Sequence, residues 1–361
     1  MEHLLTQPST SAGYGLVVYR AAGHIDAIDQ YSRRLVAALR NTGECVGYAP
    51  NGLSYRHVRA SAPAWLLLQY NPFSYGRWGF APGLVWDVLR LRRRRAPHLA
   101  VLVHEAWVGM RDWRSIVMGA YQRAQLMSLV RLADTVIVTT ESLVGEVGNG
   151  AVHIPVASNI TPVPVSRQAA RQSLGIRNEL VIGLFGTAHP SRDHSYSEAA
   201  IDGLAIHHGP SRLIILNLGA GAPAPAVPGG VAVRTPGALD SRELSVHLHA
   251  SDLLLLPLRD GLSTRRTTMM AGLAHGLPVL GLRSAHTDQI LVEHPEALGL
   301  VSAGDRREFA SAAIALTADA NRLHAMGEAA RLLYERAFDW PIAAVSVASA
   351  IYGTRRSTTA A

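Results

Sequence analysis

The sequence predicts an α/β protein with two doubly wound, Rossmann-like parallel-sheet domains that face a cleft. Three observations lead to this fold class. The chain has 361 residues, more than a single hydrophobic core usually holds. Short apolar runs alternate with helical segments along it. A stretch rich in Pro and β-branched residues at 152–166 interrupts that alternation before it starts again.

The first half begins with a strand at 15–19, a polar loop, and a helix over 30–43 that stops at Gly43. Helices connect three further strands of buried type, which are expected at 64–70, 99–105 and 134–140. This pattern is typical of βα units on a parallel sheet. We therefore expect a first domain over 1–160.

The second half repeats the pattern, and we expect a second domain over 161–337. Its expected strands start from runs at 179–189, 212–221, 231–237, 252–258 and 278–282. Its expected helices lie at 241–251 and 267–275 and within 305–338. A last helix over 338–354, expected to cross back to the first domain, has Pro341 in its first turn, where a missing N–H costs nothing.

The composition excludes several kinds of chemistry. All 34 basic residues are Arg, so a Schiff-base lysine, the usual pyridoxal-phosphate enzymes and the Lys of a Walker-A loop are excluded. Cys45 is the only cysteine, which excludes an intramolecular disulfide and a Cys-based zinc site. The first residues do not read as a signal peptide, and no apolar run is long enough to cross a bilayer. We expect a cytoplasmic protein.

The net charge of +7 does not by itself indicate nucleic acid, because no zinc finger, recognition helix or aromatic-basic pattern accompanies it. One dense basic run, at 89–95, ends a predicted helix. Cations are favoured there by the helix dipole. The run could instead attract a phosphorylated acceptor or hold the protein at the anionic inner face of a membrane. The sequence does not specify an oligomeric state.

Two adjacent arginines form the clearest candidate for chemistry. Arg265 and Arg266 follow the apolar strand at 252–258 and precede the helix at 267–275. Guanidinium groups beside the free N–H groups of a helix N-terminus suit a phosphate or diphosphate. The same pair could instead be solvated charges in a loop. The Gly-rich stretches lack the Gly-x-Gly-x-x-Gly spacing, so a nicotinamide dehydrogenase is disfavoured.

Six motifs, in order along nearly the whole chain, together resemble the retaining glycosyltransferase family 4 (glycosyl transferases group 1), which has the GT-B fold. The donor segment resembles a variant of the family with the pattern DGxSxRR. The motifs are AAGHIDAIDQYSRRLVAALRNTG, VLVHEAWVG, RLADTVIVTTESL, VIGLFGTAHPSRD, RDGLSTRRTTMMAGLAHGLPVLG and RAFDWPIAAVSVASAIYG.

The resemblance implies a donor and an acceptor. A sugar would move from a nucleotide-diphosphate sugar to a hydroxyl of a small molecule, a saccharide or a lipid-linked acceptor, with retention at the anomeric carbon. His104, Arg265 and Arg266 would be catalytic, the arginines stabilising the leaving diphosphate. The donor would be bound by Gly186, Arg192, Asp260, Ser263, Arg265, Arg266 and Thr267. The acceptor or transferred sugar would contact Gly23, His24, Asp26, Asp29 and Glu105.

The chain departs from the family pattern at three places. Ala271 stands where a glutamate normally holds the ribose hydroxyls, and the usual phosphate-binding Lys is missing. The paired glycines of the first loop are reduced to Gly23 beside His24. Asp29 could orient an acceptor hydroxyl, and it could instead cap the helix that follows.

No cofactor and no metal are expected, because no Asp-x-Asp motif is present and arginines can supply the positive charge. Two other functions remain open. One is a nucleotide-sugar 2-epimerase on the same fold, which would need no acceptor. The other is a non-catalytic sugar-binding protein.

Overall fold

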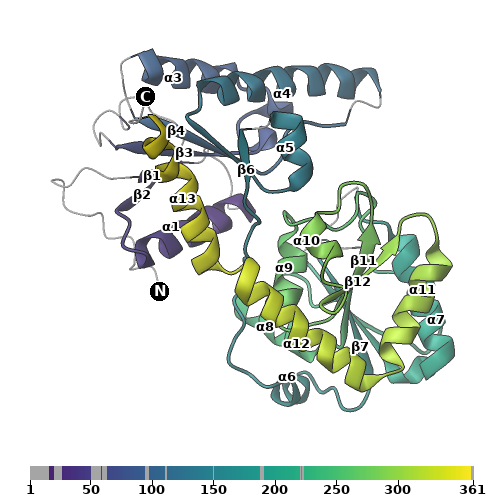
Figure 1. Ribbon diagram of the computed structural model, residues 1–361. Coiled ribbons are helices and arrows are strands. Elements are labelled where there is room, and N and C mark those ends of the chain that lie inside the picture. The colour runs from purple at the N-terminus through teal and green to yellow at the C-terminus, as the bar shows by residue number, and fades with distance from the viewer. Residues whose placement is uncertain are drawn as a thin grey trace. The chain divides into compact units, whose positions relative to one another are not determined.

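The computed structural model describes residues 16–19, 27–49, 58, 63–93, 97–109, 112–148, 150–187, 191–219, 221 and 223–358. The chain divides into two compact units. The first unit holds Met1–Thr139, Leu143–Ile154 and Ala343–Ala361, and the second holds Thr140–Ser142 and Pro155–Ile342. Each unit is built on one six-stranded sheet in which all the paired strands are parallel (Figure 1).

The sheet of the first unit has the order β2-β1-β3-β4-β5-β6. Its strands are β1 (Leu16–Tyr19), β2 (Val46–Ala49), β3 (Trp65–Tyr70), β4 (His98–Val103), β5 (Thr135–Val138) and β6 (Ala151–His153). Its helices are α1 (Ala27–Asn41), η1 (Pro72–Ser74), η2 (Arg77–Gly79), α3 (Pro82–Arg93), α4 (Trp113–Leu132) and α5 (Glu141–Val147), with the end of α13 (Trp340–Thr358).

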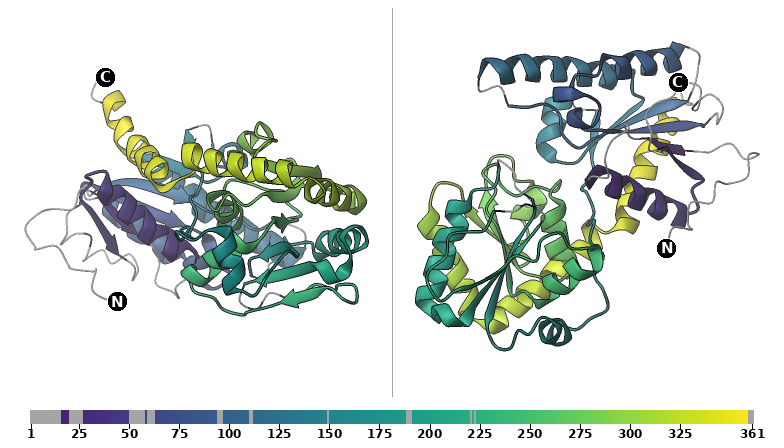
Figure 2. Two further views of the ribbon diagram at one scale, coloured as in Figure 1. Left: turned by 90° about the horizontal axis from the view of Figure 1, so that it is seen from below. Right: turned by 180° about the vertical axis from the view of Figure 1, so that it is seen from behind.

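Helices cover both faces of this sheet, as a parallel sheet requires. Alternate residues of β3 and β4, among them Leu66, Leu68 and Val101, form one core with the inner sides of α3 and α4. The opposite face carries α1 and the end of α13 (Figures 1 and 2). There the ring of Trp65 stacks on His98 and meets the ring of Tyr352 edge-on.

The sheet of the second unit has the order β12-β11-β10-β7-β8-β9. Its strands are β7 (Leu180–Phe185), β8 (Leu213–Leu218), β9 (Ala232–Arg234), β10 (Leu253–Leu256), β11 (Val279–Arg283) and β12 (Leu298–Ser302). Its helices are α6 (Arg167–Ser173), α7 (His194–His208), η3 (Pro210–Arg212), α8 (Ser241–Ala250), α9 (Thr267–Ala274), α10 (Gln289–Val292), α11 (Arg306–Thr317) and α12 (Ala320–Ala337), with the start of α13.

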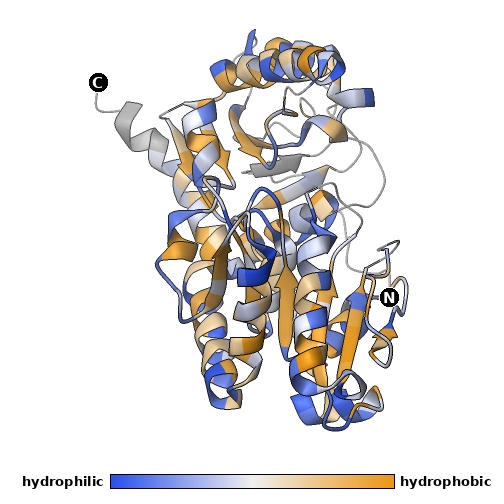
Figure 3. Ribbon diagram, turned by 90° about the vertical axis from the view of Figure 1, so that its right-hand side faces the viewer, coloured by the Kyte–Doolittle hydropathy of each residue, from blue (hydrophilic) through white to orange (hydrophobic). Residues whose placement is uncertain are grey.

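The central strands of this sheet are hydrophobic and lie between two layers of helices (Figure 3). Residues of α7 and α11 share a core with β7, β8 and β10. On the other face α9 lies very close to the sheet, because it carries Gly272. A Cβ at Gly272 would come within 2.8 Å of Val279 Cγ2 and 2.9 Å of Leu254 Cδ2.

A buried polar contact lies where α9 ends. The Nδ1 atom of His275 is 2.7 Å from the carbonyl of Ala271, which can only accept, so Nδ1 carries the proton. The Nε2 atom then accepts from the hydroxyl of Ser245 at 2.7 Å. Burial lowers the pKa of His275 from 6.5 to about 4. This histidine is a neutral part of the packing.

The sequence prediction was wrong about three short strands. β2 and β12 were not predicted, and β6 lies in a stretch predicted mostly as loop. All three lie at an edge of a sheet, where each pairs with one neighbouring strand. Their local signal is weak because each strand is short and because strand preference depends on packing against neighbouring strands. In addition, α1 begins at Ala27, earlier than the predicted residue 30.

No helix in the described ranges is both long enough and apolar enough to cross a bilayer.

Candidate functional site

The second unit has its strand order reversed between β7 and β10, which are neighbours in the sheet. The chain runs outward from β7 through β8 to β9, and outward from β10 through β11 to β12. In doubly wound sheets, ligands bind at the carboxyl ends of the strands at such a switch point. The predicted donor residues come from the two loops that follow β7 and β10. The topology therefore brings these loops together.

The loop after β7 begins with Gly186, where the backbone has φ +127°. A side chain at Gly186 would clash with neighbouring atoms. A Cβ would collide with Arg192 Nη2 and would lie 3.3 Å from Thr268 Cγ2. A Cβ at Gly219, after β8, would lie 2.5 Å from the carbonyl oxygen of Gly186. Gly186 thus allows an Arg side chain and the first turn of α9 to approach the end of β7 together.

Arg192 joins the two loops. Its guanidinium donates to the carbonyl of Phe185, and its backbone pairs with Leu258 in an antiparallel bridge. The N–H of Arg259 donates to Ser191 O at 2.7 Å on the same short ladder. Burial lowers the pKa of Arg192 from its usual value, but a guanidinium remains charged in proteins. A fixed positive charge therefore lies at the switch point.

Arg265 and Arg266 lie in the loop after β10 and share one acidic partner. Both guanidiniums donate to the same oxygen of Asp260, Arg265 at 2.9 Å. The other carboxylate oxygen of Asp260 is buried with no hydrogen-bond partner among the described residues. The arginine side chains are 28% and 15% exposed, so neither is freely solvated. This burial does not fit the interpretation of the pair as solvated loop charges.

The rest of this loop is held rigidly. The N–H of Thr264 donates to Asp288 Oδ2 at 2.6 Å and its hydroxyl donates to the same oxygen at 2.8 Å. The carbonyl of Thr264 accepts from Val156 N at 3.1 Å. Ser263 is almost fully buried beside it, and its carbonyl accepts from Arg266 N at 3.0 Å. Ser263 is thus placed as part of the loop's interior.

Helix α9 begins directly after the arginines. Arg266 is its N-cap and provides no side-chain cap, whereas α7, α8 and α11 are capped by aspartates. Among the residues that the structure describes, no side chain caps this turn, so its N–H groups, beginning with those of Thr267 and Thr268, can bind another acceptor. Thr267 and Thr268 are only partly buried. An uncapped helix N-terminus beside arginines is suited to phosphate oxygens.

The formal charge of this cluster matches a diphosphate. Arg192, Arg265 and Arg266 contribute three positive charges, and Asp260 removes one. The net value is equal and opposite to the two charges of the diphosphate diester in a nucleotide sugar. We define these four residues with Gly186 and the first turn of α9 as the switch-point cluster.

The first unit places His104 directly after β4, on the sheet face covered by α1. Its Nε2 lies 2.8 Å from Gln69 Oε1, and its ring meets the ring of Tyr31 edge-on at 5.0 Å. The amide oxygen of Gln69 can only accept, so Nε2 carries the proton and Nδ1 is the acceptor. Burial lowers the pKa of His104 to about 4. His104 is therefore a neutral, oriented imidazole at neutral pH.

Glu105 and Asp29 lie in the same unit and have partners of their own. Glu105 Oε2 accepts from Asn71 Nδ2 at 3.2 Å, at the end of β3. Asp29 is buried in the first turn of α1, where its carboxylate accepts from Tyr48 Oη at 2.7 Å and Arg33 Nε at 2.8 Å. Asp29 lies inside the helix, so it is not the cap that the sequence left open. Gly23, His24 and Asp26 lie outside the described residues.

Two residues were missed by the sequence reasoning. Asp288, which anchors Thr264, lies 24 positions away and has no local motif. Gln69, which orients His104, is a fully buried polar residue in the otherwise apolar run WLLLQY. A polar side chain inside a buried strand is a usable signal, because such a group needs a partner.

The chain matches no model of a known protein family and no curated protein. Solved structures do match it. Sucrose-phosphate synthase from Thermosynechococcus elongatus has a TM-score of 0.66 at 16% identity, and the match covers 96% of this chain and 100% of that one. HepE from Anabaena, solved with UDP-glucose, has a TM-score of 0.64 at 14% identity, and the match covers 94% of this chain and 99% of that one.

A third match is a protein from Listeria monocytogenes assigned as a UDP-N-acetylglucosamine 2-epimerase. Its TM-score is 0.60 at 14% identity, and the match covers 95% of this chain and 97% of that one. These likenesses extend over nearly the full length of each chain. The two parallel-sheet α/β domains of this chain therefore have the GT-B fold, which is the fold that the sequence predicts.

Proposed function

We propose that this protein is a glycosyltransferase that moves a sugar from a nucleotide-diphosphate sugar to a hydroxyl group, with retention at the anomeric carbon. The proposed acceptor is a small molecule, a saccharide or a lipid-linked acceptor. The observation that carries the proposal is the switch-point cluster. It combines three guanidiniums with an uncapped helix N-terminus at the strand ends where doubly wound sheets bind ligands.

The chemistry follows from the charge. Breaking the anomeric C–O bond leaves a nucleoside diphosphate, whose negative charge grows as the bond breaks. Preorganised arginines stabilise that charge more in the transition state than in the ground state. Arg265 and Arg266 are the residues proposed to do this. The rigid anchoring of their loop by Asp288 keeps the cost of reorganisation low.

A retaining reaction on this site needs no protein nucleophile. The acceptor hydroxyl attacks from the face that the diphosphate leaves, and the departing phosphate oxygen takes the hydroxyl proton. His104 is proposed to bind a hydroxyl of the transferred sugar through its fixed neutral imidazole, because a low pKa prevents it from charging near pH 7. Similarity to the family 4 variant with a DGxSxRR segment supports these assignments.

A 2-epimerase is the second candidate, because one structural neighbour is assigned that activity. The two are separated by one experiment. The protein is incubated with a panel of nucleotide sugars, first alone and then with mono- and disaccharide acceptors. NMR of the products reports both the anomeric configuration and any inversion at C2.

The proposal expects a new glycoside with the anomeric configuration of the donor, formed only when acceptor is present. Inversion at C2 of the donor without acceptor would instead establish an epimerase. A glycoside with inverted configuration would refute the retaining mechanism. Binding of a nucleotide sugar without any turnover, with or without acceptor, would support a sugar-binding protein.

A further inference from the structure

The net charge of the protein is concentrated in one stretch of the first unit. Residues 71–132, from the end of β3 to the end of α4, contain ten arginines and three acidic residues. Their formal charge of +7 equals that of the whole chain, so all the other residues sum to zero. Helix α4 itself contains three arginines and no acidic residue.

The same stretch carries most of the large apolar side chains that are exposed. Seven of the twelve such residues in the described ranges belong to it: Phe73, Trp78, Phe80, Trp86, Trp113, Ile116 and Val117. Trp113 is 71% exposed and Trp78 is 66% exposed. Scattered apolar residues are ordinary on a surface, but a cluster of this kind marks an interaction site.

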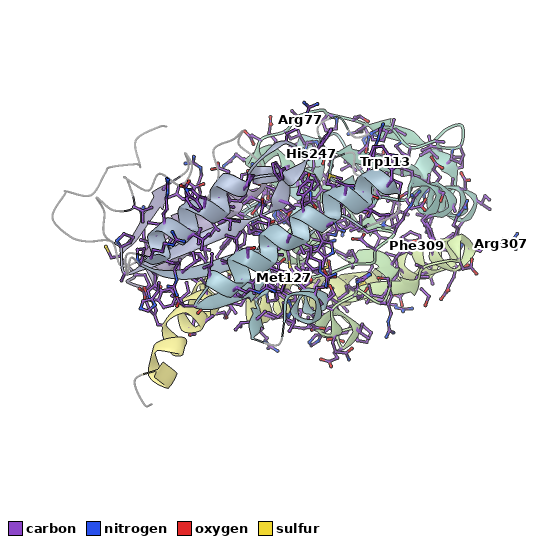
Figure 4. The ribbon with its side chains drawn as sticks, turned by 90° about the horizontal axis from the view of Figure 1, so that it is seen from above. Arg77, Trp113, Met127, His247, Arg307 and Phe309 are labelled. Carbon is purple, nitrogen blue, oxygen red and sulfur yellow. The ribbon has the colours of Figure 1, made fainter. Side chains whose placement is uncertain are left out.

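The helices of this stretch have an inner and an outer side. Leu84 of α3 and Leu126 of α4 lie on the inner side, in the core that these helices share with the sheet. Trp86, Arg90 and Arg93 are exposed and follow one another at helical spacing on the outer side of α3. Figure 4 looks onto this layer of helices. The exposed side chains of α3 therefore lie on the side away from the sheet, and η1, η2 and the first turns of α4 carry the other exposed side chains of this stretch.

Three of the exposed tryptophans have an arginine against the ring. The guanidinium carbon lies 5.1 Å from the ring centroid for Arg77 and Trp78, 5.2 Å for Arg90 and Trp86, and 5.2 Å for Arg114 and Trp113. Such Arg–Trp pairs combine an apolar ring with a positive charge at one point of the surface. Arg92, in contrast, is used within the fold, where it pairs with both oxygens of Asp134.

The backbone holds Trp78 outward at a cost. Its φ of 57° is the only positive φ of a non-glycine residue in the described part of the chain, and a tryptophan there is strained. The carbonyl of Trp78 accepts from Tyr121 Oη, and from Gln122 Nε2 at 2.8 Å. Gln125 Nε2 donates to Gly79 O at 3.2 Å. Side chains of α4 thus fix the turn that displays Trp78.

We propose that this surface, which we call the α3–α4 face, docks on an anionic lipid bilayer. It consists of Phe73, Arg77, Trp78, Phe80, Trp86, Arg90, Arg93, Trp113, Arg114, Ile116 and Val117. Its Trp and Phe side chains enter the boundary between headgroups and acyl chains, and the arginines bind the lipid phosphates around them. The proposal is independent of the transferase proposal, because docking needs neither donor nor acceptor.

Charge decides between a bilayer and the other occupants. A second copy of the chain would bring the same positive surface against itself in a symmetric dimer, which like charges disfavour. A nucleic acid would pair with the arginines but would leave the aliphatic side chains of Ile116 and Val117 in water. A membrane interface accommodates both kinds of side chain at once.

The test uses the full chain and two kinds of vesicle, phosphatidylcholine alone and an equal mixture with phosphatidylglycerol. Co-sedimentation should show binding to the mixed vesicles that weakens as salt rises. An arginine near an anionic surface contributes about 1 kcal/mol, or roughly fivefold. The triple variant Arg90→Gln, Arg93→Gln, Arg114→Gln should therefore bind about a hundredfold more weakly. Trp113→Ser should weaken binding about tenfold, because part of the indole is buried in the interface.

Matched controls come from the second unit. Ile206 on α7 and Arg307 on α11 are also exposed, and Ile206→Ser with Arg307→Gln should leave vesicle binding unchanged. Thermal melts check that every variant is folded. No binding of the wild-type chain to the mixed vesicles would overturn the proposal. So would equal loss in the control variants, a concentration-dependent dimer that needs the same face, or displacement from vesicles by RNA with tighter binding to the RNA.

Discussion

Removing the Arg266 side chain is the sharpest test of the switch-point cluster. Arg266→Ala lowers the formal charge of the cluster from +2 to +1, and leaves Asp260 paired with Arg265 alone. If Arg266 stabilises the departing diphosphate, its loss removes a contact that strengthens as the bond breaks. Loss of such a contact typically costs about 3 kcal/mol, or roughly a hundredfold in turnover. The fold should lose far less, since one partly exposed ion pair contributes about 1 kcal/mol or less.

The assay is initial-rate kinetics with the donor identified by the nucleotide-sugar panel, together with thermal melts of each variant. Arg265→Ala should behave in the same way as Arg266→Ala. Arg266→Lys should recover only part of the rate, because a point charge cannot replace a planar fork. Arg307→Ala, an exposed arginine of the same unit, is the matched control and should keep wild-type kinetics. Wild-type turnover and donor affinity in both Arg265→Ala and Arg266→Ala would refute the assignment of this cluster to the donor phosphates.

The loop anchor, a buried histidine and the supply of positive charge can each be tested separately. Asp288→Asn should lower the unfolding free energy by about 2 kcal/mol and also reduce turnover, because Thr264 N and Oγ1 lose a charged acceptor. A denaturant melt identical to that of the wild type would contradict this prediction. Stability should fall as the pH drops from 6.5 to about 4, because the unfolded chain binds a proton at His275 that the folded chain does not. The unfolding free energy should fall by about 3 kcal/mol over this pH range, at 1.36 kcal/mol per pKa unit. Urea unfolding of His275→Gln should show a smaller fall over the same range. An equally steep fall in the variant would show that other groups cause it. Exhaustive chelation should leave turnover unchanged, since guanidiniums supply the positive charge; activity that returns only on addition of a divalent cation would count against this.

The fold could be predicted because its signals are local and repeated. Each buried strand of a parallel sheet is a run of apolar residues, and LLLL of β10 or LVIGLF of β7 shows this without any partner. Strands such as β2 and β6 have three or four residues with a mixed pattern, and they exist because a neighbouring strand binds them. Their stability depends on the neighbouring strand, so these strands cannot be predicted from a short segment of the sequence.

The candidate site shows the same division between local and long-range information. The position of Arg265 and Arg266 between a strand and a helix can be predicted from consecutive residues. Their shared partner Asp260 is also nearly local, because the three residues lie within seven positions. The role of Asp260, however, cannot be read from the local sequence. The sequence offered Asp260 as a donor-binding residue. The structure makes it the counter-charge of both arginines, with one oxygen bound to the pair and the other buried.

That role follows from the electrostatics of clustered guanidiniums. Arg265, Arg266 and Arg192, at the carboxyl ends of the central strands β7 and β10, repel one another before an anion binds, and burial from water strengthens the repulsion. A carboxylate on the same loop offsets it and holds the arginines in place. The proposed diphosphate would then meet a rigid, charged surface and would bind without reordering long side chains. The anchor that makes this surface rigid, Asp288, contacts Thr264 from 24 residues away. A binding site can therefore be recognised from the residues that touch the ligand, while the residues that hold those in position become visible only when the chain is folded.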